Sequence, residues 1–147
     1  MTEPISIYVC FEPERRGYAE RLDTWPWTNE DLVFYNGRVS VAVDSREAEP
    51  IKVCLRQQIE QADVTVCVIA ATTCGDPWIA WELEVSKSEP DPNGLVGITL
   101  HEFDEHPPAM VDSGAIFVAF KRDLVERAVR WALTDKHTSD DFGLRDF

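Results

Sequence analysis

The sequence predicts an α/β domain in which helices cover both faces of a parallel sheet. Short apolar runs rich in β-branched residues alternate along the chain with segments of helical periodicity. The run at residues 64–71 (VTVCVIAA) is apolar throughout, which is typical of a strand that is buried on both faces. Strands that alternate with helices in one domain are usually parallel. Five such strands suit the flavodoxin-like order 2-1-3-4-5.

The expected elements follow from local composition. The five strands are expected at residues 5–11, 32–35, 64–71, 95–100 and 115–120. Helices are expected at residues 13–23, 51–62 and 123–133, and another begins at Asp76-Pro77, a capping residue followed by a first-turn proline. The valines at alternate positions in residues 39–43 could extend the second strand. We expect one domain at residues 1–134 and a polar tail, without regular structure, at residues 135–147.

Composition restricts the function. The chain has 147 residues, enough for one core, and its 14 basic and 27 acidic side chains give a formal net charge of −13. That charge argues against binding to nucleic acid or to an anionic membrane surface. The four cysteines form neither a CxxC pair nor a zinc-ligand pattern. Reduced thiols in a cytoplasmic protein are the simplest account of these cysteines, and we expect neither a signal peptide nor a membrane-spanning segment.

This chain lacks the sequence motifs of several protein families that share this fold class. The loop after the first strand, FEPERRG, does not contain the GxGxxG of a dinucleotide-binding domain. A phosphorylated receiver domain would need a carboxylate after the third strand, where this chain has Ala70-Ala71-Thr72. Neither a GxxxxGK phosphate loop nor a GxSxG nucleophile turn is present.

A WxxWE sequence remains as the best candidate for chemistry. Trp78 and Glu82 are four residues apart, so they are neighbours on one helix face. An aromatic wall beside a carboxylate suits a sugar attached to a flat cationic base, because the carboxylate can stabilise positive charge that develops on the sugar. The alternative is that Trp78 and Trp81 are core anchors and Glu82 is a solvated helix residue. Spacing alone leaves both interpretations open.

Two stretches resemble a known family. The first strand, IYVCF, resembles the opening strand of the TIR (Toll/interleukin-1 receptor) superfamily. Residues 51–85 resemble the middle of that family, with a helix ending IEQAD, the strand VTVCVIA and the segment WIAWELE. The similarity is greatest to the TIR-like proteins of the Thoeris anti-phage defence system, and it extends over about residues 5–133.

The resemblance implies a flavodoxin-like TIR fold and an NAD+ glycohydrolase or ADP-ribosyl cyclase type of activity. NAD+ is then the substrate, no cofactor or metal is expected, and the product is an ADP-ribose-derived second messenger, cyclic or otherwise, that activates a separate effector protein. Glu82 corresponds to the catalytic glutamate. The implied substrate-binding residues are Cys10, Phe11, Asp44, Ser45, Arg46 and Trp78.

The implied roles differ among these residues. Phe11 would flank the nicotinamide and Trp78 would support the pocket wall. Cys10 stands where the family usually has serine. The loop at residues 44–49 would gate the site and mediate TIR–TIR contact, and Arg46 could bind a phosphate of NAD+ or form an exposed salt bridge.

Two further hypotheses stay open. The chain could be a non-catalytic TIR scaffold that acts by homotypic assembly, in which Glu82 is structural. It could also be a flavodoxin-like protein that binds a nucleotide other than NAD+.

Overall fold

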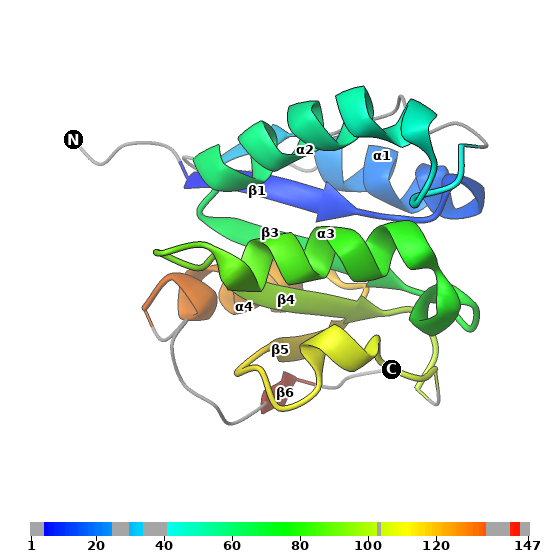
Figure 1. The fold of residues 1–147 in the computed structure, drawn as a ribbon. Coiled ribbons are helices and arrows are strands. Elements are labelled where there is room, and N and C mark those ends of the chain that lie inside the picture. The colour runs from blue at the N-terminus through cyan, green and yellow to red at the C-terminus, as the bar shows by residue number, and fades with distance from the viewer. Residues whose placement is uncertain (1–4, 25–29, 34–40, 103, 135–141, 145–147) are drawn as a thin grey trace.

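The computed structural model describes residues 5–24, 30–33, 41–102, 104–134 and 142–144, and within them six strands form one parallel sheet (Figure 1). The strand order is β2-β1-β3-β4-β5-β6. The strands are β1 (Ile5–Cys10), β2 (Glu30–Val33), β3 (Val64–Ile69), β4 (Gly94–Thr99), β5 (Ile116–Ala119) and β6 (Phe142–Leu144). The α-helices are α1 (Arg16–Thr24), α2 (Glu49–Gln61), α3 (Pro77–Ser88) and α4 (Arg122–Thr134). The short 3-10 helices are η1 (Pro13–Arg15), η2 (Arg46–Ala48), η3 (Thr73–Gly75) and η4 (Pro108–Met110).

The predicted α/β class and parallel sheet are confirmed, whereas the predicted number of five strands is wrong. The first five strands keep the order 2-1-3-4-5, and β6 is added at the edge beside β5. The expectation of a tail without regular structure is therefore wrong at residues 142–144, because a three-residue strand is too short to leave a pattern in the sequence. Val41 and Val43 lie in a loop instead of a strand, and residues 34–40 lie outside the described part of the chain.

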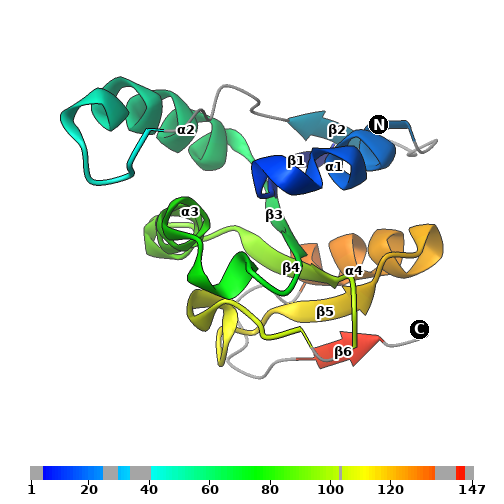
Figure 2. The same cartoon turned by 90° about the vertical axis from the view of Figure 1, so that its right-hand side faces the viewer.

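Helices cover both faces of the sheet. Figure 2 shows α2 and α3 on one side and α1 and α4 on the other. Alternation along β1 sends Ile7 and Val9 toward α1 and α4, and it sends Tyr8 and Cys10 toward α2 and α3. We call the first layer the α1/α4 core and the second the α2/α3 core.

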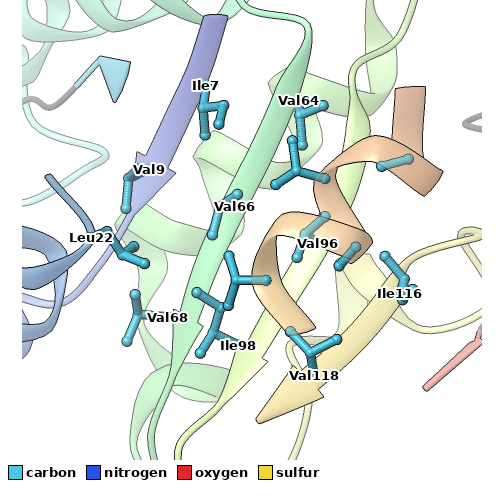
Figure 3. Packing of buried hydrophobic residues seen from close by; sticks show 14 of the residues in the cluster. Ile7, Val9, Leu22, Val64, Val66, Val68, Val96, Ile98, Ile116 and Val118 are labelled. Atoms are coloured by element: carbon cyan, nitrogen blue, oxygen red, sulfur yellow. The ribbon is translucent and has the colours of Figure 1, made fainter. Parts of the chain in front are cut away.

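The α1/α4 core is largely aliphatic. Val66, Val96 and Ile98 lie at its centre with almost no exposed surface, and Figure 3 shows them packed among their neighbours. Leu22 of α1 and Val129 of α4 belong to the same cluster and cover these strand residues from the helix side. Each such side chain contributes about 1.5–3 kcal/mol by leaving water.

The α2/α3 core combines aliphatic and polar residues. Leu55 and Ile59 of α2 are fully buried, and their spacing of four residues puts them on one face of the helix. The buried side of α3 includes Ile79 and Leu83, but also the polar residues Glu82 and Ser86. This layer therefore contains the buried groups that could support chemistry.

We predict that Gly94→Ala lowers the free energy of unfolding by about 2 kcal/mol, as overpacking of a filled site does. A Cβ atom at Gly94 would lie 2.5 Å from the carbonyl oxygen of Ala132 and 2.9 Å from its Cβ, so α4 would have to move off β4. Urea denaturation followed by circular dichroism measures the change. Gly17→Ala is the control, because it has nothing within 4 Å and removes a helical glycine, so we expect a gain of about 0.5–1 kcal/mol. Equal stability of the Gly94 variant and the parent would contradict this packing.

Candidate functional site

Glu82 is a buried carboxylate in the second turn of α3. Only 3% of its surface is exposed, and the hydroxyl of Tyr8 donates a hydrogen bond of 2.7 Å to Glu82 Oε2. Tyr8 itself is 1% exposed. The alternative of a solvated Glu82 is therefore wrong, whereas Trp78, 7% exposed, is indeed a core residue.

The start of α3 lies at the carboxyl end of β3, as the sequence predicts. The side chain of Asp76 accepts a hydrogen bond of 3.0 Å from the backbone N–H of Ile79, and Pro77 occupies the first turn. Glu82 lies further along the helix. Because its partner Tyr8 belongs to β1 itself, the carboxylate lies over the face of the sheet instead of beyond the strand ends.

A second contact fixes α3 one turn beyond Glu82. The hydroxyls of Thr65 and Ser86 are 2.8 Å apart, and Ser86 Oγ donates its proton to the carbonyl oxygen of Glu82 at 3.0 Å. Thr65 must therefore donate to Ser86. Asn93 Nδ2 completes the chain by donating to Thr65 Oγ1 at 3.1 Å and to the carbonyl oxygen of Ile59 at 2.9 Å. These bonds connect α2, β3 and α3 inside the α2/α3 core.

The loop before α2 is attached to α3 through Trp78. The indole Nε1–H donates a hydrogen bond of 2.7 Å to the carbonyl oxygen of Val41, and Ala48 at the end of the loop is buried in the same core. Asp44 and Arg46 are exposed on this loop, and Ser45 donates a hydrogen bond of 2.6 Å to the carbonyl oxygen of Ala42. The loop therefore lies against α3 with its charged residues facing solvent.

The predicted site residues fall into three places. Cys10, Trp78 and Glu82 share the α2/α3 side of the sheet, where Cys10 is fully buried. Asp44, Ser45 and Arg46 lie on the loop before α2. Phe11 packs in the α1/α4 core, so the structure does not bring it together with Cys10, Trp78 and Glu82.

A second buried carboxylate, Glu12, is not among the residues that the sequence predicts for the site. It is 7% exposed and accepts hydrogen bonds from Thr72 Oγ1 at 2.9 and 3.0 Å and from Thr73 Oγ1 at 2.6 Å. These residues follow β1 and β3, the neighbouring strands at which the strand order reverses. The sequence could have indicated this contact, because it has a carboxylate after β1 and two adjacent hydroxyls after β3, which is the neighbouring strand in the expected order. Tyr8 was missed too, although it is a polar-tipped residue on the same side of its strand as Cys10.

Cys74 lies at the same carboxyl ends of the strands, beside Glu105. Its Sγ donates to Glu105 Oε2 at 3.6 Å. Partial burial and the hydrogen bond and negative charge of Glu105 raise the pKa of the Cys74 thiol. Since only the thiolate is a strong nucleophile, this environment argues against nucleophilic catalysis by Cys74 at neutral pH.

Neither a metal site nor a membrane span is found in the described part of the chain. No three His, Cys, Asp or Glu side chains there are arranged to hold a metal ion, and no helix there is both long and apolar enough to cross a bilayer. Within the described residues, Trp81 and Arg56 line a surface hollow of about 350 Å³, and Tyr18 and Arg21 line another of about 220 Å³. Glu82 lines neither of them.

We predict that Glu105→Gln accelerates alkylation of Cys74 by iodoacetamide severalfold at pH 7.5. Removing the carboxylate charge lowers the pKa of the thiol and so raises the thiolate fraction at this pH. The rate is measured on the Cys74 peptide by mass spectrometry over time. Cys54, which is exposed on α2, provides the control within the same sample, and its rate should stay constant. An unchanged rate at Cys74 would contradict the role given to Glu105.

Comparison with known proteins identifies the family. The family model described as "Thoeris protein ThsB, TIR-like domain" matches residues 8–104. A search of curated proteins finds no match. The matched region runs from β1 past β4 and includes Tyr8, Glu12, Trp78 and Glu82. Since the match covers more than half of the 147 residues, this chain belongs to the Thoeris ThsB TIR-like domain family.

Proposed function

We propose that the chain cleaves NAD+ at the nicotinamide–ribose bond and that Glu82 is its catalytic residue. Membership of the Thoeris family supports a role in anti-phage defence. The observation that carries the proposal of catalysis is the burial of Glu82 in a largely apolar layer. A buried carboxylate gives up its hydration, and here the hydroxyl of Tyr8 replaces part of it with a hydrogen bond. Ionisable groups kept in such places are candidates for function.

The proposed reaction needs one carboxylate and a shielded site. The bond between nicotinamide and the ribose carbon breaks, and nicotinamide leaves as a neutral molecule with the bonding electron pair. Positive charge develops on the ribose, and Glu82 stabilises it across a short distance in an environment of low polarity. Water then adds to the ribosyl cation and loses a proton to give ADP-ribose, or a nucleophilic atom of the same molecule adds to it, again with loss of a proton, to give a cyclic product. Trp78 lies one turn before Glu82 and would form the wall of the site.

Access to Glu82 requires a conformational change. Glu82, Tyr8 and Cys10 are all enclosed between the sheet and α3. The loop before α2 is the element held against α3 by Trp78, so we propose that it opens to admit NAD+. Asp44, Ser45 and Arg46 would then contact the substrate at the entrance, and contact with another TIR domain would favour the open loop. The product would pass to a separate effector protein.

One observation favours a competing function. Glu82 is engaged by Tyr8 and enclosed, as a purely structural residue in a buried polar network would be. A scaffold that acts only by TIR–TIR assembly would need no more than this. The two functions differ in whether nicotinamide is released.

We predict nicotinamide release from NAD+ by the wild type, and a loss of about 10²–10³-fold in kcat on Glu82→Gln, as when a single charge-stabilising group is removed. Chromatography with mass spectrometry detects nicotinamide and identifies the ADP-ribose product. The assay is run at low protein concentration, with a crowding agent and in infected-cell lysate. Glu84→Gln is the matched control, because Glu84 is exposed on the same helix and pairs with Lys87 at 3.9 Å.

The outcomes separate the two functions. Release by the wild type and Glu84→Gln, but not by Glu82→Gln, supports catalysis by Glu82. Absence of nicotinamide under all three conditions, together with retained self-association, would favour the scaffold.

We also predict that Trp78→Phe loosens the loop before α2. Phenylalanine keeps an aromatic ring in the core but lacks the N–H that bonds to Val41. Backbone amides of residues 42–48 should exchange with deuterium faster, by about 5- to 10-fold if the lost bond contributes about 1 kcal/mol. Trp81→Phe is the control, since no bond from its indole to the loop is found among the described residues. Equal exchange in both variants would show that the indole does not hold the loop.

A further inference from the structure

We propose that Tyr8 is a positioning residue, which orients the carboxylate of Glu82 through its hydroxyl. The inference rests on the proposed function, because it concerns the residue that would stabilise the ribosyl cation. Its basis is the buried hydrogen bond of 2.7 Å between Tyr8 and Glu82 Oε2, which joins positions that are 74 residues apart in the sequence.

The position of Tyr8 is fixed by the sheet. β1 is a central strand, paired with β2 on one side and β3 on the other, and Tyr8 lies opposite Thr65 in the parallel register with β3. Tyr8 is 1% exposed, so its ring is held on all sides. A side chain on a central strand provides a more rigid support than one on a loop.

Tyr8 and Thr65 together determine how α3 faces the sheet. These two paired residues contact Glu82 and Ser86, which are four residues apart and so lie on the same face of the helix. Two contacts a full turn apart prevent α3 from rotating about its axis. The carboxylate is therefore kept on the side of the helix that faces the sheet, where it is shielded from water.

The hydroxyl of Tyr8 gives this side chain a role that packing does not. A phenylalanine would fill almost the same volume in the α2/α3 core, so apolar packing alone gives no reason for tyrosine. A hydrogen bond donated to a carboxylate restricts its rotation. This effect serves a group that must be correctly aimed when positive charge develops on the ribose.

The test is Tyr8→Phe, which removes one oxygen atom and leaves the ring. We expect kcat for nicotinamide release to fall about 10- to 100-fold, as expected for loss of a hydrogen bond to a charged group, while KM changes less than about twofold. A residue with a merely structural role would lower stability without separating kcat from KM in this way. The melting temperature and circular dichroism of each variant are recorded, and rates are measured well below the lowest melting temperature.

Tyr18→Phe is the matched control. Tyr18 lies on α1, on the other face of the sheet, where its ring meets that of Phe120 edge-on at 5.2 Å between centroids. The same atom is removed there without touching the α2/α3 core, so kcat and KM should equal those of the wild type.

The possible results are distinguishable. A folded Tyr8→Phe variant with a reduced kcat and a near-normal KM supports the positioning role. An unchanged or raised kcat in a folded Tyr8→Phe variant, with an active wild type, overturns it while leaving catalysis by Glu82 intact. Absence of nicotinamide from the wild type would instead overturn the proposed function and this inference with it.

Discussion

The parallel register between β1 and β3 is the constraint on which the candidate site depends. It places Tyr8 opposite Thr65, and both side chains point toward α3. Tyr8 then bonds to Glu82 and Thr65 to Ser86. A shift of β1 by one residue would turn Tyr8 to the other face of the sheet and leave Glu82 without this partner, while Thr65 stayed opposite Ser86. The sheet therefore determines the rotation of α3, and through it the burial of the carboxylate.

The side chains that cover the two faces of the sheet differ in composition. The α1/α4 core consists of apolar side chains and provides hydrophobic stability. The buried polar residues Thr65, Glu82, Ser86 and Asn93 instead form hydrogen bonds with one another and with α2 in the α2/α3 layer. Burying polar groups is tolerated when each is paired, and an aliphatic layer on the opposite face can offset what remains of the penalty. A carboxylate can thus be kept away from water without loss of the fold.

The sequence predicted the layers and the first five strands, but it predicted neither β6 nor the geometry of the site. Strand and helix alternation predicted the layers and the order of the first five strands, because that pattern is local. The three residues of β6 left no such pattern. On α3, the polar residues Glu82 and Ser86 share the buried face with Leu83, so periodicity could not tell buried from exposed. Their partners on β1 and β3 depend on register between distant segments. The position of Phe11 could have been predicted, because alternation along the strand puts it on the same face as Ile7 and Val9.

Three successive turns of α3 are held by three different elements. Trp78 bonds to the loop before α2, Glu82 to β1, and Ser86 to β3, and each position is four residues after the last. The contacts to β1 and β3 belong to the rigid interior of the sheet, whereas the contact to Val41 belongs to a loop with exposed charges. Breaking the loop contact would therefore release the loop from Trp78 while Glu82 and Ser86 stay attached to the sheet. We infer that loss of the bond between Trp78 and Val41 can open the site without displacing the carboxylate. The free energy of opening then depends on the loop, whereas the orientation of the Glu82 carboxylate depends on Tyr8.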